Sequence, residues 1–423
     1  MSELGPSPLM AGEPQLSVAA ARAAIHAALV PIRGSEAVSL NAALGRVLAE
    51  DVVSPMDVPP HDNSAMDGYA FDGAALREGM PLRLRVVGTA YAGAPIDSTA
   101  APGECVRVMT GAVMPTGLDT VVPQELCQEE HDAVRIEPGV IRRGENRRRR
   151  GEDLACGKPA LQAGRILRPA DIGLIASLGF QAVHVQRRLR VALFSTGDEV
   201  FAPGQPLPPG GIYDSNRFSL QAALQRLGVD VVDLGLVGDD PKALEATLER
   251  AVREADAVVT SGGVSVGAAD HTRELLARMG QVAFWKVAMR PGRPFAFGPL
   301  RAGAGRSAWL FALPGNPVAA LVTFYAFVRE ALWVLGGAKP EPLPALQARC
   351  ATAIRKRPGR TEFQRGIVSD AGDGTWKVAI TGAQGAGILR SLSEANALVV
   401  LGHEQGSVAA GDPVTVWLFD GLT

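Results

Sequence analysis

Residues 189–200, LRVALFSTGDEV, combine the pattern of a buried strand with a polar loop that holds two adjacent carboxylates. The same order of strand and polar loop returns at 229–241 (VDVVDLGLVGDDP) and at 256–270 (DAVVTSGGVSVGAAD). Strands that alternate with helices of about 10 to 15 residues are typical of a mostly parallel, doubly wound sheet. A long apolar helix from Pro317 to Leu335 follows. We therefore predict a three-layer α/β domain over residues 189–336.

The rest of the chain has different sequence patterns, which indicate three further domains. Residues 51–154 carry short β-rich runs separated by Gly, Pro and Asp-Gly steps, which predict a β-rich insert domain. Residues 1–50 and 155–188 flank this insert and predict a small helical and linker domain. Residues 337–423 are strand-like with glycine turns and predict a C-terminal β-barrel-like domain. The fold class is thus multidomain α/β plus β. Helical spacing and capping residues predict helices at Ser17–Val30, Leu40–Glu50 and Pro169–Leu178.

Composition excludes several classes of protein. The 423 residues include 42 basic and 44 acidic side chains, and the net charge of −2 argues against a polycation that coats nucleic acid. Aromatic residues make up 5% of the chain, too few for a platform that stacks single-stranded bases. The longest uncharged apolar stretch, Val318 to Val328, is shorter than the about 20 residues of a membrane helix. The four cysteines form no CxxC pair, which favours reduced thiols in a cytoplasmic protein.

Carboxylates gather at the carboxyl ends of the predicted strands. Glu199 lies in the loop after the first strand, Asp239 after the second, and Asp270 at the end of the loop after the third. Open α/β sheets bind ligands at this edge, and carboxylate oxygens suit Mg²⁺ that is shared with a phosphate. The alternative is that these residues form turns and cap helices, as Asp240 before Pro241 indicates.

The third loop and the segments after it favour an anion. Glycines between a strand and a helix offer backbone N–H groups and the positive end of a helix dipole. Ala268 stands where a P-loop has its Lys, so the pattern does not predict an ordinary nucleoside triphosphatase. Cationic side chains follow at Lys286, Arg290 and Arg293, and the turn LPGNP at 313–317 leads into the long helix. Carboxylates and cations around one cleft suit a metal and an oxyanion together. The alternative is a solvated basic loop.

Two stretches of the β-rich insert are dense in charge. PPHDNSAMDGYAFDG at 59–73 brackets apolar Met66 and Tyr69 between acidic residues, which favours a structured loop. IRRGENRRRRGED at 141–153 has six arginines, either a solvated surface or a rim that collects anions. The six histidines are scattered, and neither a Ser-His-Asp nor a Cys-His set is apparent.

Nine motifs follow one another along the chain: DNSAMDGYA, RVMTGAVMP, RRRGED, ALFSTGDE, IYDSN, SGGVSVGAAD, FWKVAMRPGRPFAFG, LPGNPVA and PGRTEFQRG. Together they resemble the MoeA family of molybdopterin molybdenumtransferases, whose relatives include the gephyrin E domain. The resemblance extends from about residue 17 to the end of the chain. It implies an elongated cytoplasmic homodimer with four domains per subunit. It also implies Mg²⁺-dependent transfer of molybdenum from molybdate to adenylylated molybdopterin, with release of AMP.

The resemblance also implies roles for individual residues. The expected Mg²⁺ ligands are Glu199, Asp239 and Asp270. The positions expected to act in catalysis are Asp67, Thr110, Asp153, Lys286, Arg290 and Arg365. The residues assigned to substrate binding are Asp214, Asn216, Ser261, Gly262, Gly263, Ser265, Pro314, Asn316 and Pro317.

Two positions depart from the family pattern. Arg290 stands where many relatives have Lys, which keeps the charge but binds oxyanions in a planar fork. Ala386 stands where relatives often have Ser, which removes a hydroxyl expected near molybdate.

Two other functions remain open at this stage. The first is a molybdopterin adenylyltransferase that uses ATP, and the extra β domains and the PGRTEFQRG segment argue against it. The second is a gephyrin-like scaffold, which would need fused partner domains that these 423 residues do not show. The resemblance makes the adenylyltransferase of the same pathway and recipient molybdoenzymes the expected protein partners.

Overall fold

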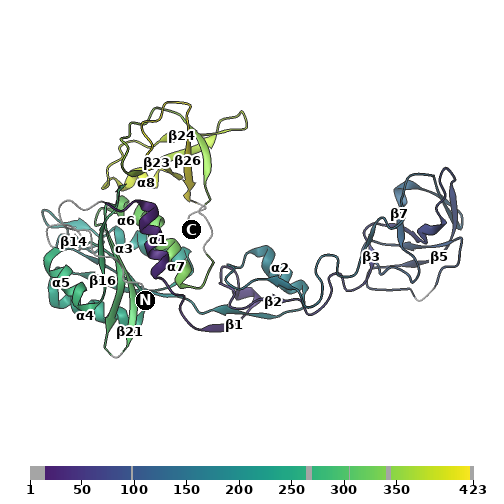
Figure 1. Ribbon diagram of the computed structural model, residues 1–423, viewed down its shortest axis with the longest axis horizontal. Coiled ribbons are helices and arrows are strands. Elements are labelled where there is room, and N and C mark those ends of the chain that lie inside the picture. Colours follow the sequence, from purple (N-terminus) through teal and green to yellow (C-terminus); the bar gives the residue numbers. More distant parts are fainter. Residues whose placement is uncertain (1–14, 97–98, 263–268, 304, 340–343, 420–423) are drawn as a thin grey trace.

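The computed structural model describes residues 15–96, 99–262, 269–303, 305–339 and 344–419, with only the backbone at 269–271. The molecule is elongated (Figure 1). The α/β domain and the C-terminal barrel lie together at one end, and the β-rich insert lies at the other. A narrow region of short strands joins the two ends, so the insert stands clear of the α/β domain.

The α/β domain contains a six-stranded sheet in the order β16-β13-β17-β21-β20-β18. The first four strands are parallel, whereas β20 runs antiparallel to β21, and the edge strand β18 runs antiparallel to β20. Apolar side chains on both faces of the central strands are buried, as a sheet covered on both sides requires. The predicted doubly wound sheet is therefore confirmed. Its strands are β13 (Arg190–Thr196), β16 (Asp230–Val237), β17 (Ala257–Ser261), β18 (Ala283–Lys286), β20 (Pro294–Ala302) and β21 (Arg306–Leu313).

Helices cover both faces of this sheet. On one face lie α4 (Pro241–Glu254) and α5 (Ala269–Met279). On the other lie α3 (Asn216–Arg226) and a helix that runs from residue 317 to 335. Its segments are α6 (Pro317–Thr323), a π-helical turn η4 (Phe324–Val328) and α7 (Arg329–Leu335). By length and composition this helix could span a bilayer, but 78% of its most apolar window is buried, which is typical of a core helix.

Helix α1 (Val18–Ala28) begins where the sequence predicts, with the Ser17 hydroxyl accepting the Ala20 N–H. Its buried residues Val18, Ala21 and Ile25 join the hydrophobic cluster of the long helix 317–335. The helix thus packs on the α/β domain, although we assigned it to the helical and linker domain. We propose that α1 belongs to the α/β domain, and we otherwise keep the division into four domains.

The joining region has a small core of its own, between two antiparallel strand pairs and one helix. These elements are β1 (Ser35–Ser39), β12 (Ala182–Gln186), β2 (Val52–Val53), β11 (Pro159–Leu161) and α2 (Pro169–Ser177). The predicted helix Leu40–Glu50 is wrong, because only a 3-10 turn, η1 (Leu40–Ala42), forms there. Gly45 adopts φ +72° and turns the chain, after which Val47 and Leu48 make single β-bridges to residues of this region.

The β-rich insert holds a six-stranded sheet in the order β7-β4-β6-β5-β9-β8, with hydrophobic clusters on both faces. The dense stretch 59–73 is ordered, and β3 within it pairs with β10 in the arginine run. The elements are β3 (Asn63–Ser64), β4 (Gly68–Phe71), η2 (Gly73–Ala75), β5 (Leu82–Ala90), β6 (Glu104–Val108), β7 (Thr120–Pro123), η3 (Gln124–Leu126), β8 (Cys127–Glu130), β9 (Ala133–Ile136) and β10 (Arg147–Arg148).

The C-terminal domain is a closed five-stranded barrel, since β23 pairs with both β24 and β25 and thereby completes the ring. The short strand β19 (Met289–Arg290) of the α/β domain pairs in parallel with β23. This pairing fixes the cationic loop of the α/β domain against the barrel. The barrel elements are β22 (Leu346–Cys350), β23 (Thr361–Asp370), β24 (Trp376–Ile380), α8 (Leu389–Ser393), β25 (Ala397–Leu401) and β26 (Pro413–Leu418).

Candidate active site

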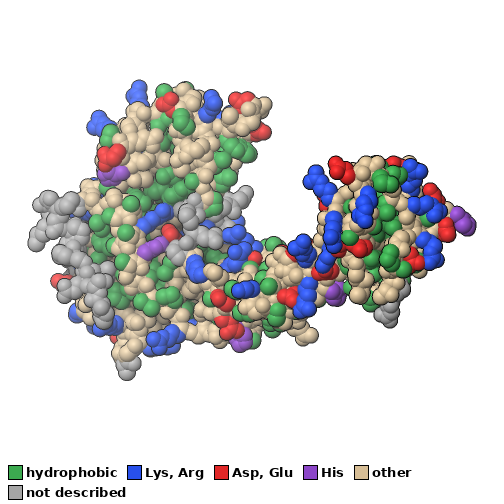
Figure 2. All heavy atoms as spheres, turned by 45° about the vertical axis from the view of Figure 1, so that its right-hand side comes forward, with side chains coloured by type: hydrophobic (Ala, Val, Ile, Leu, Met, Phe, Trp, Pro, Cys, Tyr) green, Lys and Arg blue, Asp and Glu red, His purple; other side chains and the backbone are tan. Residues whose placement is uncertain are grey.

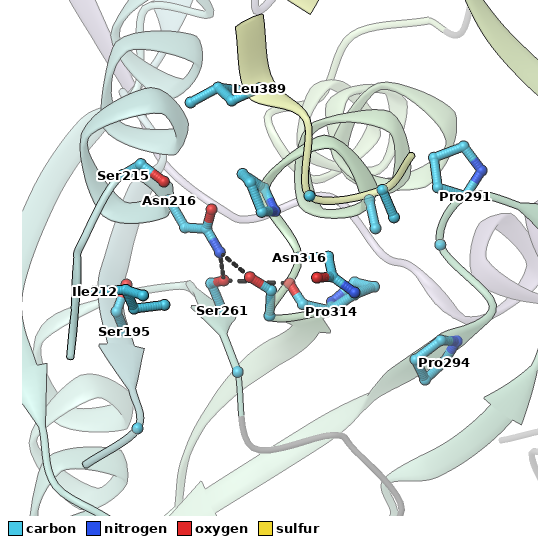
Figure 3. Close-up of a pocket in the computed structure, with 18 of the residues that line it drawn as sticks. Ser195, Ile212, Ser215, Asn216, Ser261, Pro291, Pro294, Pro314, Asn316 and Leu389 are labelled. Atoms are coloured by element: carbon cyan, nitrogen blue, oxygen red, sulfur yellow. Dashed lines mark hydrogen bonds between the residues drawn. The ribbon is translucent and has the colours of Figure 1, made fainter. Parts of the chain in front are cut away.

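A cavity of about 1090 Å³ lies between the carboxyl ends of the parallel strands and the barrel. Its floor comes from the loops after β13, β17 and β21, and one side comes from the segment 290–294. The strand pair β14 (Val200–Phe201) and β15 (Ile212–Tyr213) forms another side, and the barrel segment 384–389 covers it. Figure 3 shows Leu389 across the cavity from Ser261.

The floor is tied together by the side chain of Asn216. Its amide nitrogen donates to the Ser261 hydroxyl at 2.6 Å and to the Gly315 carbonyl at 2.7 Å (Figure 3). Ser261 in turn donates to the Pro314 carbonyl at 3.3 Å. Beside it, buried Asp214 accepts from the Ser195 hydroxyl at 3.0 Å and pairs with Arg217 at the start of α3. These contacts make the loops after three strands one rigid surface.

Buried polar atoms at the cavity face have no protein partner among the described residues. They are the amide oxygen of Asn216 and the hydroxyl of Thr196, whose residues are 9% and 8% exposed. Such groups cost free energy unless something satisfies them, so they are available to a ligand. Sequence analysis did not single out Thr196, although it lies within the ALFSTGDE motif.

Position 262 has no room for a side chain, so only glycine fits there. Its φ is +94°, and a Cβ there would lie 2.5 Å from the Thr196 carbonyl oxygen and 2.7 Å from its hydroxyl. The backbone at Gly262 therefore passes close to the end of β13, and its N–H donates to the Leu313 carbonyl at 3.2 Å. The predicted ligand residues Gly263 and Ser265 lie outside the described residues, whereas Pro314, Asn316 and Pro317 line the cavity.

Two of the three predicted metal ligands, Glu199 and Asp239, line one side of the cavity. Burial raises the pKa of Asp239, and the neighbouring charges of Asp198 and Glu199 raise it further. The Asp198 carboxylate also accepts the Asp239 backbone N–H at 3.0 Å, which holds Asp198 against the start of the loop after β16. Among the described side chains no group of three metal-ligand residues is formed, and the side chain of Asp270 is not described.

The opposite side of the cavity is cationic. Arg290, Arg293 and Arg360 all line it. Arg360 comes from the barrel and pairs with buried Glu362 at 2.8 Å, whereas no carboxylate contacts Arg290 or Arg293 among the described residues. Lys286, predicted to act with Arg290, lies at the end of β18 and is not among the described lining residues. Arg360 was missed, although it belongs to the quoted PGRTEFQRG motif.

Arg365 lies behind the cavity wall and is 1% exposed. Its guanidinium donates to the carbonyls of Ala383 (3.2 Å), Gln384 (3.3 Å) and Gly385 (3.0 Å), and to the Ser391 hydroxyl (3.0 Å). Burial lowers the pKa of this guanidinium, and the charge of Arg290 lowers it further. The side chain thus shapes the segment that covers the cavity, and it is not among the described lining residues.

Comparison with known proteins covers almost the whole chain. The family models for the MoeA N-terminal region (domain I and II), the probable molybdopterin binding domain and the MoeA C-terminal region (domain IV) match residues 16–179, 192–333 and 347–419. A molybdopterin molybdenumtransferase of Haemophilus influenzae is 41% identical over 92% of this chain and 95% of its own length. The chain belongs to the MoeA family. Molybdopterin molybdenumtransferase 2 of Mycobacterium tuberculosis is 40% identical over 90% of this chain and 94% of its own.

A solved structure agrees with this MoeA membership. The molybdopterin biosynthesis moeA protein of Pyrococcus horikoshii superposes with a TM-score of 0.81 at 28% identity, over 96% of this chain and 100% of its own. The agreement includes the α/β domain, the mixed sheets and the closed barrel.

The remaining predicted site residues of this MoeA chain lie outside the cavity. In the insert, the Thr110 backbone N–H and hydroxyl each donate to Asp67 at 2.7 Å. These two hydrogen bonds, the backbone one first, lower the pKa of Asp67. Asp153 is exposed and lies where the insert meets the joining region. Figure 1 places the insert at the far end of the molecule from the cavity, so one chain does not bring these residues to it.

The arginine run is partly neutralised within the same chain. Arg143 pairs with Asp119 at 2.7 Å, Arg150 pairs with Asp57 at 2.6 Å, and Arg147 pairs with Asp62. Basic side chains gather where the insert meets the joining region (Figure 2). Three of the six arginines are therefore paired with carboxylates of the insert itself, which neither of the two predicted interpretations included.

Proposed function

We propose that this protein transfers molybdenum from molybdate to adenylylated molybdopterin and releases AMP. The enzyme class, a transferase of molybdenum cofactor biosynthesis, follows from its relatives. One observation supports the detailed reaction best: a single cavity has carboxylates on one side and three arginines on the other. This is the arrangement that a phosphate-bearing substrate and a separate oxyanion need if they are to react together.

The arginines bind the oxyanion. Arg290, Arg293 and Arg360 provide planar forks that can give parallel hydrogen bonds to a tetrahedral dianion. Their charge also offsets the negative charge that gathers as dithiolene sulfurs replace the oxygens of molybdate. Arg365 acts through the covering segment 383–385, whose carbonyls it holds, and we now assign it a positioning role in place of a direct catalytic one.

The opposite side of the cavity suits Mg²⁺. Glu199 and Asp239 provide oxygen donors. Burial raises the pKa of Asp239 most, and the repulsion from Asp198 and Glu199 that raises it further is what a cation would relieve. With Asp270 they remain the proposed ligands. Bound there, Mg²⁺ would neutralise charge on the pyrophosphate bridge. The Asn216 and Thr196 side chains, which have buried polar atoms without a protein partner, hold the substrate beside it.

A molybdate-dependent assay of AMP release tests this function directly. We expect AMP to appear only when adenylylated molybdopterin, molybdate and Mg²⁺ are all present. ATP consumption without molybdate would instead identify an adenylyltransferase. Arg360 disfavours that alternative, because it comes from the barrel and not from the α/β domain.

Replacing Asp239 by Asn is expected to stabilise the Mg²⁺-free protein at neutral pH. The pKa of Asp239 is higher in the folded than in the unfolded chain, so its ionisation costs folding free energy above the folded pKa. The gain should disappear as pH falls below the unfolded pKa, where both states are protonated. We expect the unfolding midpoint to rise by about 1 to 3 °C and the further rise on adding Mg²⁺ to shrink.

Asp240→Asn is the matched control for this measurement. Asp240 lies next in the chain and caps α4 by accepting the Ala243 N–H at 2.9 Å, and Asn caps equally well. This variant should keep the Mg²⁺-dependent rise of the wild type. An equal rise in Asp239→Asn and wild type would contradict the metal role.

Ala386→Ser should lower the molybdate concentration for half-maximal insertion by several-fold. Ala386 and Arg290 line the same cavity, and the Ala386 carbonyl is fixed by the Val318 N–H at 3.1 Å. A hydrogen bond to a charged group contributes about 1.5 to 3 kcal/mol, which sets the upper limit of the gain. Arg290→Lys should raise the same concentration, and the double variant should lie between them. Molybdate titrations of all four proteins measure this, and two neutral single changes would place the oxyanion elsewhere.

The assembly and its location complete the proposal. We propose a cytoplasmic homodimer that receives its substrate from a molybdopterin adenylyltransferase and delivers its product to molybdoenzymes. The distance of the Asp67–Thr110 pair from the cavity supports the dimer, because a second chain could bring the pair to it.

A further inference from the structure

A second cavity of about 500 Å³ lies beside the main one. Its walls come from Gln15, from Met289 and Arg293, and from the turn 357–360 at the start of β23. Met289, Arg293 and Arg360 line both cavities. The two spaces therefore share one wall, and that wall carries two guanidinium groups.

Backbone hydrogen bonds fix all three walls. The Leu16 carbonyl accepts the Ala288 N–H at 2.7 Å, and the Ala288 carbonyl accepts the Thr361 N–H at 2.9 Å. The turn 357–360 is held from behind, because Gly359 donates its N–H to the His403 carbonyl at 2.9 Å. The second cavity is thus built into the junction of α/β domain and barrel and needs no ligand to form.

Positive charge dominates this cavity. Arg293, Arg357 and Arg360 line it, and none of the described lining residues is acidic. Glu362 balances one charge through its pair with Arg360. Beneath the turn, buried Lys356 donates to the carbonyls of Gln405 at 2.6 Å and Arg357 at 3.3 Å, which adds a further cation. A small anion is the ligand that this charge distribution favours.

We propose that this second cavity is an outer binding site for a free tetrahedral oxyanion of the molybdate class. Arg293 and Arg360 then pass the anion to the main cavity, since their side chains line both. Among the described residues the outer site has no aromatic side chain to hold a base, which favours an inorganic oxyanion over the phosphate of a nucleotide. This inference rests on the proposed function, because it supplies that reaction's metal source.

Tungstate is the probe, because it is a tetrahedral dianion that scatters X-rays anomalously. Crystals of the full chain soaked in tungstate should show two anions, one in each cavity. Arg357→Gln should lose the outer anion and keep the inner one, and Arg290→Gln should do the reverse. Arg349→Gln, an exposed arginine on β22 that lines neither cavity, is the control and should keep both.

Titrations with molybdate and with AMP test whether the outer site binds the inorganic oxyanion or a nucleotide phosphate. Arg357→Gln should raise the half-saturating molybdate concentration about ten-fold and leave AMP binding unchanged. A single tungstate in the main cavity, an outer tungstate that survives in Arg357→Gln, or an outer site that takes AMP but no tungstate would overturn the proposal. The tungstate readout needs no turnover, so two bound anions without molybdate-dependent AMP release would refute the proposed function alone.

Discussion

Mixed dimers of two inactive variants are expected to recover about a quarter of the wild-type activity. The variants are Asp67→Asn, in the insert, and Glu199→Ala, in the main cavity. In one chain these residues lie at opposite ends of the molecule (Figure 1). If the insert of one subunit completes the cavity of the other, a mixed dimer has one cavity with both residues intact. Random exchange makes about half of the dimers mixed, and half of their cavities are active.

The complementary mixture sharpens this test. A chain that carries both substitutions, mixed with wild type, should leave only about a quarter of the activity if the site is shared between subunits. Each cavity of that mixed dimer lacks one residue. If instead each chain contained its own complete site, the same mixture would keep about half. The molybdate-dependent release of AMP measures both mixtures, after mass spectrometry has shown that the subunits exchange.

Asp67→Asn is chosen because it changes charge and little else. Thr110 donates two hydrogen bonds to one Asp67 oxygen, and the Asn amide oxygen can accept the same two. Asp72→Asn in the same insert is the control, since Asp72 caps η2 through the Ala74 N–H, a role that Asn can keep. This variant should be active by itself, without mixing with a second variant. No recovery in the first mixture, despite proven exchange, would place the whole site in one chain.

The fold was largely predictable because its signals are local. The parallel strands are apolar on both faces and end at Gly and Asp steps, and α1 and α4 begin at good capping residues. The predicted helix Leu40–Glu50 does not form, because Val47 and Leu48 make β-bridges to other segments instead of helical hydrogen bonds. Those partners lie more than 100 residues away in the chain, so tertiary pairing overrides a helical pattern there.

The site was less predictable, because a motif does not show which of its residues faces the ligand. PGRTEFQRG contains Arg360, just before β23, and Arg365, within β23. The structure turns Arg360 toward the cavity and Arg365 away from it, since β23 brings Arg365 against the segment 383–385. The direction of each arginine side chain depends on how the barrel closes, which the motif does not show. The same closure places Gln384 over the cavity, which its sequence context does not indicate, and Ala386 beside it, a position that only the family resemblance implied.

Variants of these two arginines should therefore fail in different ways. Arg360→Gln is expected to raise the half-saturating molybdate concentration at least ten-fold, because a bidentate charged contact is lost. Its maximal rate and unfolding midpoint should stay near those of the wild type, since the Gln amide can still donate to Glu362. Arg360→Lys should recover part of the molybdate affinity.

Arg365→Met should instead cut the maximal rate at saturating molybdate by roughly a hundred-fold or more and lower the unfolding midpoint. It leaves three part-buried carbonyls and the Ser391 hydroxyl without this donor, and each such loss costs about 1 to 3 kcal/mol. Arg365→Lys should not restore the rate, because one ammonium cannot reach all four acceptors in the geometry of a guanidinium. Thermal unfolding and molybdate titration together separate the two residues. A stable Arg365→Met protein with a normal maximal rate and weakened molybdate use would show that Arg365 reaches the anion, and the positioning role would be wrong.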